Sequence, residues 1–526
     1  MLDLSLLKTG GMETRDYQLR AAEKLFETRR LLVVMPTALG KTFVAVLAIA
    51  HLLKAQEKKI LFLAPTKPLV LQQANRMREL IESTEETAVV TGEMPPEERK
   101  KKYAQATVVC ATPQTIENDL KSSRISLGDF VLVVFDEAHR AVGDYAYVPI
   151  GAEAQKTGCM VLALTASPSS ERKKIADVCR NLGVNAVEIK TAEDEEVKKF
   201  VKEVKVFYEF VDLPPEIVEL RKQLQEILSG PLSRLNERGF VASKTSVSRK
   251  QLLFLRIKFL EMAKRNPSFF PLLSETAKAL NIAHAIDLLE SEGIKPLLSF
   301  LEGLEERKIT TKAVLALSKD PRIATIKAEC ERLLEKKIEH PKMILLKQYA
   351  ARIASSRKNA IIFAHYRDSV SYLVSELNAL PGVKARALVG RAEGGMSQKE
   401  QHSVVESFRN GEFNFLLSTS IGEEGLDIPS VDIVIFFEAV PSEIRLIQRR
   451  GRAGRVNAGE AVVFVAKGTK DEAYLWISKN KEKKMQKHLQ RMQHSPQGGQ
   501  AENAGESEKP KEKKLARKGQ TKIGDF

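Results

Sequence analysis

The segment MPTALGKT, residues 35–42, combines residue types that can hold a triphosphate. Gly40 lets the backbone approach an anion closely, Lys41 supplies a positive charge for the outer phosphates, and Thr42 supplies a hydroxyl group for Mg²⁺. A helical pattern follows, and the free amide groups at a helix start are further phosphate ligands. Short glycine and lysine strings also occur by chance in unrelated loops. We predict that the nucleotide ligands in this loop are Pro36, Thr37, Ala38, Leu39, Gly40, Lys41 and Thr42.

Two adjacent carboxylates, Asp136 and Glu137, follow an apolar run further along the chain. Asp136 can bind Mg²⁺, while Glu137 can polarise the water that attacks a γ-phosphate. We therefore predict catalytic roles for Lys41, Asp136 and Glu137, with Thr42 and Asp136 as metal ligands. The alternative is a solvated turn. Nearby His139 either couples this site to the segment after the next strand or caps the loop.

A third group of candidate residues is basic. The sequence QRRGRAGR, residues 448–455, places Arg452 and Arg455 three residues apart, which is one face of a helix. From that face, arginines can reach across a cleft and neutralise the charge that develops on a transferred phosphate. We predict that both arginines are catalytic. The alternative is a solvated basic helix.

The elements that must position these residues are short apolar runs separated by helical segments. Runs rich in Val, Leu and Ile without polar alternation are typical of strands buried on both faces of a parallel sheet. A first group lies at 31–34, 60–64, 107–111, 131–135 and 160–164, and a second at 360–364, 385–389, 414–418, 432–436 and 461–465. The predicted fold is therefore α/β, with two parallel-sheet domains. The motifs of the first group each follow a run, where ligands of such sheets bind.

Between the two groups the pattern is helical, because leucines recur at spacings of three and four from about 214 to 340. We predict domains at 1–205, 206–340 and 341–490, followed by a disordered basic tail at 491–526. In the helical domain, Lys244, Arg249 and Lys250 are candidates for phosphate contacts. Phe254 and Phe259 fit a leucine-rich helical pattern, so we predict that they are core residues rather than stacking platforms.

Composition favours an anionic partner. The chain has 526 residues, with 83 Lys and Arg against 68 Asp and Glu, which gives a formal charge of +15 and attraction to polyanions. The four cysteines lie far apart without metal-ligand spacing, so we expect buried thiols in a reducing compartment. We expect an intracellular, soluble protein, because no apolar stretch reaches about 18 residues and the start lacks the pattern of a secretory signal.

Taken together, the motifs resemble those of the superfamily 2 helicases, and in particular of the family of the archaeal Hef helicase and the Fanconi anaemia group M translocase. The motifs that carry this resemblance are RDYQ, MPTALGKT, APTKPL, ATPQ, DEAH, TAS, IIFAHYRDS, STSIGEEGLDIP and QRRGRAGR. Helicase loops of this kind commonly have Gly where this chain has Ala38. We expect weakened nucleotide binding at worst, at a cost of about 1 kcal/mol if that residue needs positive φ.

The resemblance implies two RecA-like domains that close on ATP and Mg²⁺, with the helical insertion as a thumb that grips branched DNA. It implies that Gln18 reads adenine and that Asp427 and Gln448 also contact the nucleotide. The residues that it places near a nucleic-acid backbone are Thr66, Lys67, Thr112, His365 and Thr419.

We therefore expect an ATP-dependent DNA helicase or translocase acting on forked or branched DNA in replication-fork repair and restart. Two alternatives stay open: an RNA-stimulated ATPase of the antiviral-sensor or Dicer kind, and a non-catalytic scaffold that binds junctions. The resemblance implies a cytoplasmic, nucleoid-associated protein of an archaeal cell. At the chain end, Gln520, Ile523 and Phe526 have the spacing of a sliding-clamp binding box, so a clamp is a possible partner.

Overall fold

The fold is described from a computed structural model of the chain. The residues whose structure it describes are 2–8, 14–35, 39–55, 59–82, 84, 87–166, 172–191, 194–198, 205–244, 247–305, 311–390, 395–419, 429, 431–439 and 459–493. The predicted tail, including Gln520, Ile523 and Phe526, lies outside them.

The first domain is built on a seven-stranded sheet with the order β3-β4-β2-β5-β6-β1-β7, in which every neighbouring pair is parallel. Its strands are β1 (Arg30–Val34), β2 (Lys59–Leu63), β3 (Ala88–Val90), β4 (Val108–Ala111), β5 (Phe130–Phe135), β6 (Met160–Thr165) and β7 (Ala186–Ile189). Alternate residues enter opposite cores: Leu31 packs on one side of the sheet and Leu32 on the other. Apolar residues without alternation thus form strands covered on both faces.

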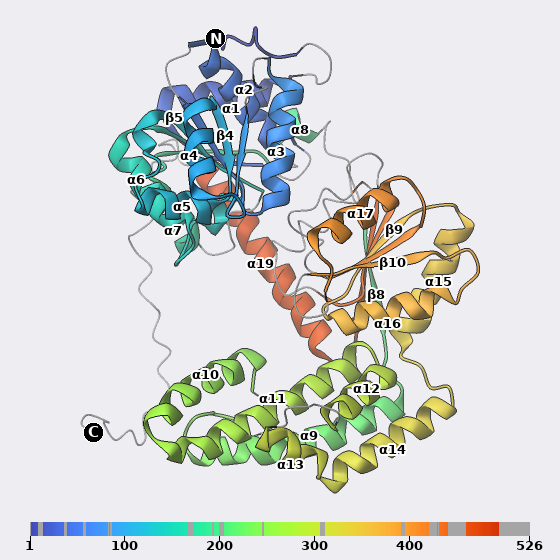
Figure 1. Cartoon of the computed structure of the whole chain (residues 1–526). Helices are drawn as coiled ribbons and strands as arrows, with labels where there is room; N and C mark the ends of the chain where they lie inside the picture. Colours follow the sequence, from blue (N-terminus) through green and yellow to red (C-terminus); the bar gives the residue numbers. More distant parts are fainter. Residues whose placement is uncertain are drawn as a thin grey trace.

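Helices cover both faces of this sheet (Figure 1). They are α1 (Asp16–Thr28), α2 (Lys41–Ala55), α3 (Lys67–Leu80), α4 (Pro96–Gln105), α5 (Pro113–Lys121), α6 (Tyr147–Thr157), α7 (Arg172–Leu182) and the short α8 (Glu195–Lys198). Helices α1, α2 and α3 pack against one core, and α5, α6 and α7 against the other. Because all strands are parallel, their carboxyl ends meet at one edge, which positions the candidate site there.

The second domain has a six-stranded parallel sheet with the order β10-β11-β9-β12-β13-β8. Its strands are β8 (Lys205–Val211), β9 (Ala360–Phe363), β10 (Ala385–Leu388), β11 (Phe415–Ser418), β12 (Ile433–Phe436) and β13 (Glu460–Ala466). The helices of this part are α15 (Pro341–Ser355), α16 (Arg367–Asn378), α17 (Gln398–Arg409) and α19 (Lys470–Gln493).

Strand β8 corrects the expected domain boundary. Residues 206–211, expected in the helical insertion, pair with β13 from Lys205↔Glu460 to Val211↔Ala466. The strand is half exposed at the sheet edge, and Glu209 interrupts its apolar residues. It therefore lacks the continuous apolar run that marked the other strands of this sheet. At the other end of the domain, α19 runs past the expected boundary at 490.

Between β8 and α15 the described residues form helices and no strand. These are α9 (Pro215–Glu237), α10 (Arg249–Arg265), α11 (Phe270–Ser291), α12 (Ile294–Glu305), α13 (Lys312–Ser318) and α14 (Pro321–Glu335). They share one apolar core that includes Leu224, Phe259 and Leu289. At the start of α10, Ser248 and Gln251 form a reciprocal capping box that satisfies free amides. The expected class, two parallel-sheet domains around an all-helical insertion, is confirmed for the described residues.

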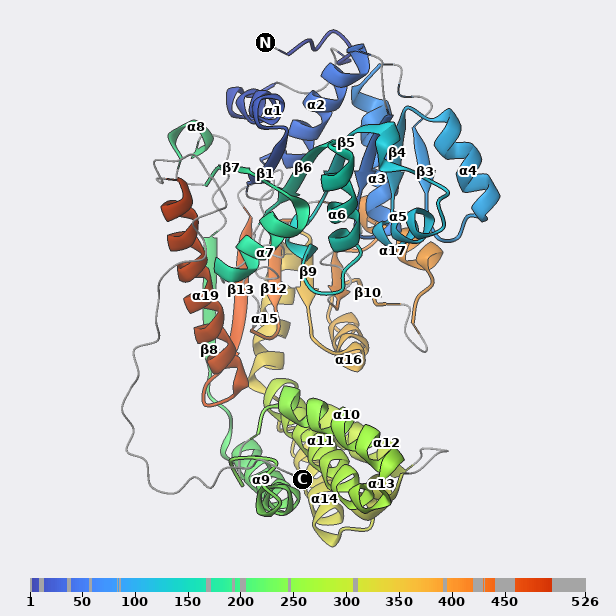
Figure 2. The ribbon, with the colours of Figure 1, turned by 90° about the vertical axis from the view of Figure 1, so that its left-hand side faces the viewer.

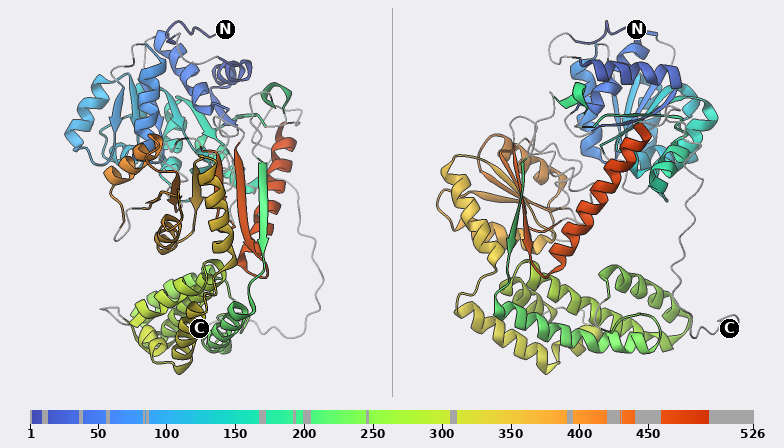
Figure 3. Two further views of the ribbon diagram at one scale, coloured as in Figure 1. Left: turned by 90° about the vertical axis from the view of Figure 1, so that its right-hand side faces the viewer. Right: turned by 180° about the vertical axis from the view of Figure 1, so that it is seen from behind.

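Helix α19 runs from beside the helical domain, along the second domain, to the first domain (Figures 1 and 3). At its start, Lys470 forms an ion pair with Asp287 of α11. The Lys342 ammonium and the Asp471 carboxylate form a buried ion pair, which ties α15 to the same helix. Further along, α19 runs beside β8 and β13 and ends beside the first domain (Figure 2), where Met485 is buried in its core. One helix thus contacts all three parts.

Candidate nucleotide and nucleic-acid site

The phosphate-binding candidates lie between the end of β1 and the start of α2. Gly40 has φ +76°, a backbone conformation that favours glycine, and Lys41 is the first residue of α2. A Cβ atom on residue 40 would lie 2.5 Å from Gln18 Nε2, so a side chain there would require the Gln18 amide to move. Pro36, Thr37 and Ala38 lie outside the described residues, so the effect of Ala38 stays a prediction.

Helix α1 supports this loop through hydrogen bonds. Gln18 Nε2 and the Tyr17 hydroxyl both donate to the Leu39 carbonyl, at 2.9 and 3.0 Å. Gln18 Oε1 accepts from the Arg15 amide at 3.2 Å, and both Tyr17 and Gln18 are buried. The amide group of Gln18 is thereby fixed against the loop that precedes Lys41. A role of Gln18 in reading adenine stays a proposal.

Glu137 lies two residues after the end of β5 and faces Lys41 at the edge of the sheet. The Lys41 Nζ to Glu137 Oε1 distance is 3.8 Å. His139, in the 3₁₀ turn η2 (Ala138–Arg140), has Nδ1 at 3.3 Å from Glu137 Oε2 and at 3.3 Å from the Thr165 hydroxyl at the end of β6. The Glu137 carboxylate therefore contacts Lys41 and His139, and His139 in turn contacts Thr165.

The Asp136 carboxyl group is buried, and the chain around it is held by side chains that the sequence did not single out. The Tyr147 hydroxyl donates to the Asp136 carbonyl at 2.6 Å, and Gln73 Nε2 lies 3.4 Å from Asp136 Oδ2. The backbone amide of Glu137 donates to Asp136 Oδ1 at 3.0 Å. Tyr147 and Gln73 are not among the predicted site residues, so these contacts become visible only in the structure.

The two carboxylates have opposite pKa shifts. Burial, and then the charge of Glu137, raises the pKa of Asp136 against the opposing effect of Lys41. Burial also acts to raise the pKa of Glu137, but Lys41 and His139 together lower it. Glu137 is therefore ionised at neutral pH and can act as a base, while Asp136 gains most from a bound cation that offsets its buried charge.

Thr42 and Asp136 fit a magnesium ion by donor chemistry. A hydroxyl and a carboxylate are hard oxygen ligands, and Mg²⁺ in nucleotide sites keeps waters and phosphate oxygens as its other ligands. Within the described ranges, no group of three or more His, Cys, Asp or Glu could hold a metal without such added ligands. When bound, the ion would neutralise phosphate charge.

Thr66 and Lys67 follow β2, and Thr112 follows β4, so all three lie at the same sheet edge. Lys67 forms an ion pair with Glu93. Thr66 is the residue before α3 and Thr112 the residue before α5, and neither side chain caps the free backbone amides of its helix. Such amides bind phosphate groups.

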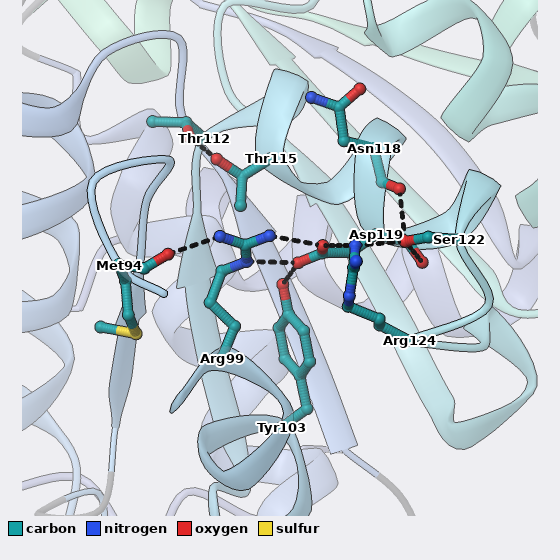
Figure 4. Close-up of polar contacts among 9 residues, drawn as sticks. All are labelled: Met94, Arg99, Tyr103, Thr112, Thr115, Asn118, Asp119, Ser122 and Arg124. Atoms are coloured by element: carbon teal, nitrogen blue, oxygen red, sulfur yellow. Dashed lines mark hydrogen bonds and ion pairs between the residues drawn. The ribbon is translucent and has the colours of Figure 1, made fainter. Parts of the chain in front are cut away.

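A buried ion-pair network fixes α5 and hence Thr112 (Figure 4). Asp119 accepts hydrogen bonds from Arg99 at 2.7 and 2.8 Å, from the Tyr103 hydroxyl at 2.8 Å and from Arg124 at 3.2 Å. Although burial opposes it, these partners lower the pKa of Asp119. The network links α4 to α5 and leaves the carboxylate fully paired.

In the second domain, His365 follows β9 and Thr419 follows β11. The His365 amide donates to Glu438 Oε2 at 2.6 Å, and Thr419 is buried. Arg249 of α10 donates to the Tyr366 hydroxyl at 2.8 Å, so this predicted phosphate ligand bridges the helical domain and the second sheet. Lys244 and Lys250 are exposed.

Helix α10 corrects one expectation. Phe259 is in the core as predicted, but Phe254 is 65% exposed, beside exposed Leu253, Ile257 and Leu260. The helix is apolar on two faces, so its leucine-rich pattern could not show which aromatic residue faces the core. Asp427, Gln448, Arg452 and Arg455 lie outside the described residues, so their roles stay predictions.

Other expectations concern the whole chain. The four cysteines are buried and free, as predicted. Across the described helices, none is long and apolar enough to cross a membrane.

Three family models match consecutive parts of the chain. Residues 11–170 match "Type III restriction enzyme, res subunit", 216–339 match "Putative ATP-dependent RNA helicase, helical bundle", and 341–457 match "Helicase conserved C-terminal domain". They correspond to the first sheet, the helical insertion and the second sheet. Such helicase domains imply the use of ATP.

Individual relatives of the chain are also helicases by name. The helicase domain of Hef from Pyrococcus furiosus is 43% identical with a TM-score of 0.68, over 88% of this chain and 98% of that one. A Methanocaldococcus jannaschii protein named "Putative ATP-dependent RNA helicase MJ1505" is 38% identical over 93% of this chain and 62% of its own length.

Eukaryotic relatives are DNA helicases by name. The ATP-dependent DNA helicase mph1 of Neurospora crassa is 33% identical over 88% of this chain and 41% of its own length. The ATP-dependent DNA helicase fml1 of Schizosaccharomyces pombe is 32% identical over 87% of this chain and 57% of its own length. This chain thus spans less than two thirds of these curated relatives. The chain belongs to the superfamily 2 helicases, in the family of Hef and the Fanconi anaemia group M helicases.

Proposed function

We propose that the chain is an ATP-driven helicase or translocase that acts on forked or branched DNA during replication-fork repair and restart. The observation that carries this proposal is the meeting of Lys41 and Glu137 at 3.8 Å, beside buried Asp136 at the ends of parallel strands. A lysine, a base and a metal-binding carboxylate at this place are the groups that phosphoryl transfer requires.

In this proposal, each predicted site residue of the first domain has one role. Lys41 and the amides at the start of α2 bind the outer phosphates, and Thr42 with Asp136 would hold Mg²⁺. Glu137 orients the attacking water and accepts its proton, since Lys41 and His139 keep its carboxylate ionised. Arg452 and Arg455 would complete the site from the second domain, so that ATP favours closure of the two domains.

The nucleic-acid side of the proposal rests on position and charge. Thr66, Lys67 and Thr112 share one sheet edge with the nucleotide site, so a strand bound there would sense domain closure. Exposed Lys244 and Lys250 on the helical domain would contact phosphates of a second arm of the DNA. The relatives named as DNA helicases support DNA as the substrate.

Turnover across nucleic acids tests this function. We expect ATP hydrolysis to be stimulated most by forked or four-way DNA, and Lys41→Ala to abolish hydrolysis while DNA binding persists. A Lys41→Ala variant with full turnover would contradict the assignment. Tight fork binding by the native chain with negligible turnover would instead favour a junction-binding scaffold.

A second candidate is an RNA-stimulated ATPase. It is favoured by the names of the helical-bundle model and of the Methanocaldococcus relative, both of which contain "RNA helicase". Duplex RNA measured beside forked DNA of the same sequence and salt concentration separates the two, because affinity for either polyanion depends strongly on salt. Stronger stimulation by RNA would replace DNA as the substrate.

Clamp binding is a separate part of the proposal, since Gln520, Ile523 and Phe526 have the spacing of a binding box. The test is a binding titration of a peptide of residues 515–526 with an archaeal sliding clamp. An Ile523→Ala, Phe526→Ala peptide is the control. Absence of saturable binding at about hundreds of micromolar, the affinity range of weak peptide docking, would end this idea.

A further inference from the structure

Helix α3 has two faces with different surroundings. Its outer face lines a pocket of about 660 Å³, which α17 of the second domain closes from the other side. Lys67, Gln72 and Arg76 lie on this face, opposite Gln398 and His402. The two helices lie close together in Figure 2 as well. The outer face of α3 therefore lies at the junction of the two domains.

The inner face of α3 reaches the nucleotide site through Gln73. This residue is 5% exposed, and its Nε2 lies 3.4 Å from Asp136 Oδ2. The carboxylate oxygen fixes the orientation of the amide, because the reverse orientation would place two acceptor oxygens together. Gln73 is thus the group that connects α3 to the predicted metal ligand.

The second polar atom of the Gln73 amide, Oε1, has different surroundings from Nε2. Gln73 Oε1 is buried and has no hydrogen-bond partner among the described residues. An unsatisfied buried acceptor costs about 1 to 3 kcal/mol, so native proteins retain one mainly where a water, an ion or a ligand supplies the missing donor. The neighbouring Asp136 is a ligand for a hydrated cation, and the waters of such an ion are hydrogen-bond donors.

We propose that Gln73 is a positioning residue for the magnesium nucleotide: Nε2 orients the Asp136 carboxylate, and Oε1 accepts a hydrogen bond from a water of the metal. This inference rests on the proposed function, because it assumes that Asp136 holds Mg²⁺ with ATP. Gln73 belongs to the same helix whose outer face lines the pocket shared with α17.

Substitution at position 73, with its neighbour as control, tests the inference. Gln73→Met keeps the length and packing of the side chain but removes both polar atoms. We expect the Mg²⁺ concentration for half-maximal binding of a fluorescent ATP analogue to rise about tenfold, as for other partners of metal ligands. Gln72→Met, on the pocket face of the same helix, should leave this concentration unchanged.

Two further measurements make the result decisive. Gln73→Asn, which is too short to reach Asp136, should show the same rise, so the test does not depend on one variant folding well. In turnover, kcat at saturating Mg²⁺ should recover more than kcat at limiting Mg²⁺, whereas general destabilisation would lower both alike. An unchanged Mg²⁺ requirement in folded Gln73→Met would overturn the inference.

The native chain separates this failure from that of the proposed function. If the native protein binds the nucleotide in a Mg²⁺-dependent manner and Gln73→Met does so equally, only the role of Gln73 is wrong. If the native protein shows no Mg²⁺-dependent nucleotide binding at all, the proposed function itself fails.

Discussion

Glu137 combines an unusual backbone conformation with a charged contact. Its φ of 51° and ψ of 49° lie in the left-handed region, which non-glycine residues rarely adopt. Such strain persists where the surroundings hold it in place and is concentrated at functional sites. Here the hydrogen bond of its amide to Asp136 and the contact of its carboxylate with Lys41 hold it. The turn gives the two adjacent carboxylates different contacts, Asp136 with Gln73 and Glu137 with Lys41.

Glu137→Gln separates nucleotide binding from hydrolysis. The amide has nearly the same shape as the carboxylate but cannot accept a proton, so we expect single-turnover hydrolysis to fall by about 100-fold or more. Because Lys41 and the loop are intact, binding of a fluorescent ATP analogue should change only a few-fold. Equal hydrolysis by the variant and the native chain would show that another group is the base.

Helix α15 begins with a histidine that is neutral in the folded protein. His340 Nδ1 accepts from the Lys342 amide at 3.2 Å, while Nε2 lies 3.0 Å from the Glu290 carbonyl and donates to it. Burial, reinforced by Lys342, lowers the pKa of His340 to about 3. A second proton would place an N–H group against the amide, so the charged form is excluded from the cap.

This cap predicts a loss of stability in mild acid. The folded pKa lies below the unfolded value of about 6.5, so the contribution is complete above that pH and is lost progressively as the pH falls below it, by up to about 1.4 kcal/mol per unit. His340→Asn keeps a capping acceptor without a titrating proton, so its melting temperature should fall less between about pH 7 and 5. The control is His402→Asn, at an exposed position. Parallel curves for native and His340→Asn proteins would contradict the prediction.

Helix α10 presents an apolar stripe among basic residues, which is a suitable surface for unpaired bases next to phosphates. Phe254 is 65% and Ile257 62% exposed. We expect Phe254→Ala with Ile257→Ala to weaken binding of forks with single-stranded arms by about tenfold, because a stacked base contributes about 1 to 3 kcal/mol. The matched control is Leu315→Ala, 46% exposed on α13. Unchanged fork binding would contradict a role of this stripe in DNA binding.

Sequence patterns predicted the strands that are buried on both faces, and with them the edge where the motifs meet. They missed β3 (Ala88–Val90), β7 (Ala186–Ile189) and β8, because short or edge strands lack a continuous apolar run. In the site, Lys41 and Glu137 belong to motifs, but Gln73 and Tyr147 reach Asp136 only through the packing of α3 and α6. Contacts between distant helices leave no local signature in the chain.

At the scale of the molecule, α19 is the element that joins the parts. Its start is paired with α11 and α15, and Met485 near its end is buried in the core of the first domain. Among the described side chains of α19, Met485 is the one that belongs to the core of the first domain.

Met485→Ala should weaken the packing of α19 against the first domain. Loss of a buried methionine costs about 2 to 5 kcal/mol, so we expect the last turns of α19 to exchange their amide hydrogens faster, with the exchange of β1 and β5 unchanged. Small-angle scattering should show a larger radius of gyration. Lys484→Ala, at an exposed position beside it, is the control. Equal exchange in the two variants would refute the anchoring role.

Strand β8 has a mechanical consequence. It precedes the helical domain in sequence yet belongs to the second sheet, and α15, which follows the helical domain, covers the same sheet. Both chain connections of the helical bundle therefore lead to the second domain. A rotation of that domain would carry the bundle with it, and the end of the bundle farthest from the domain would move the most.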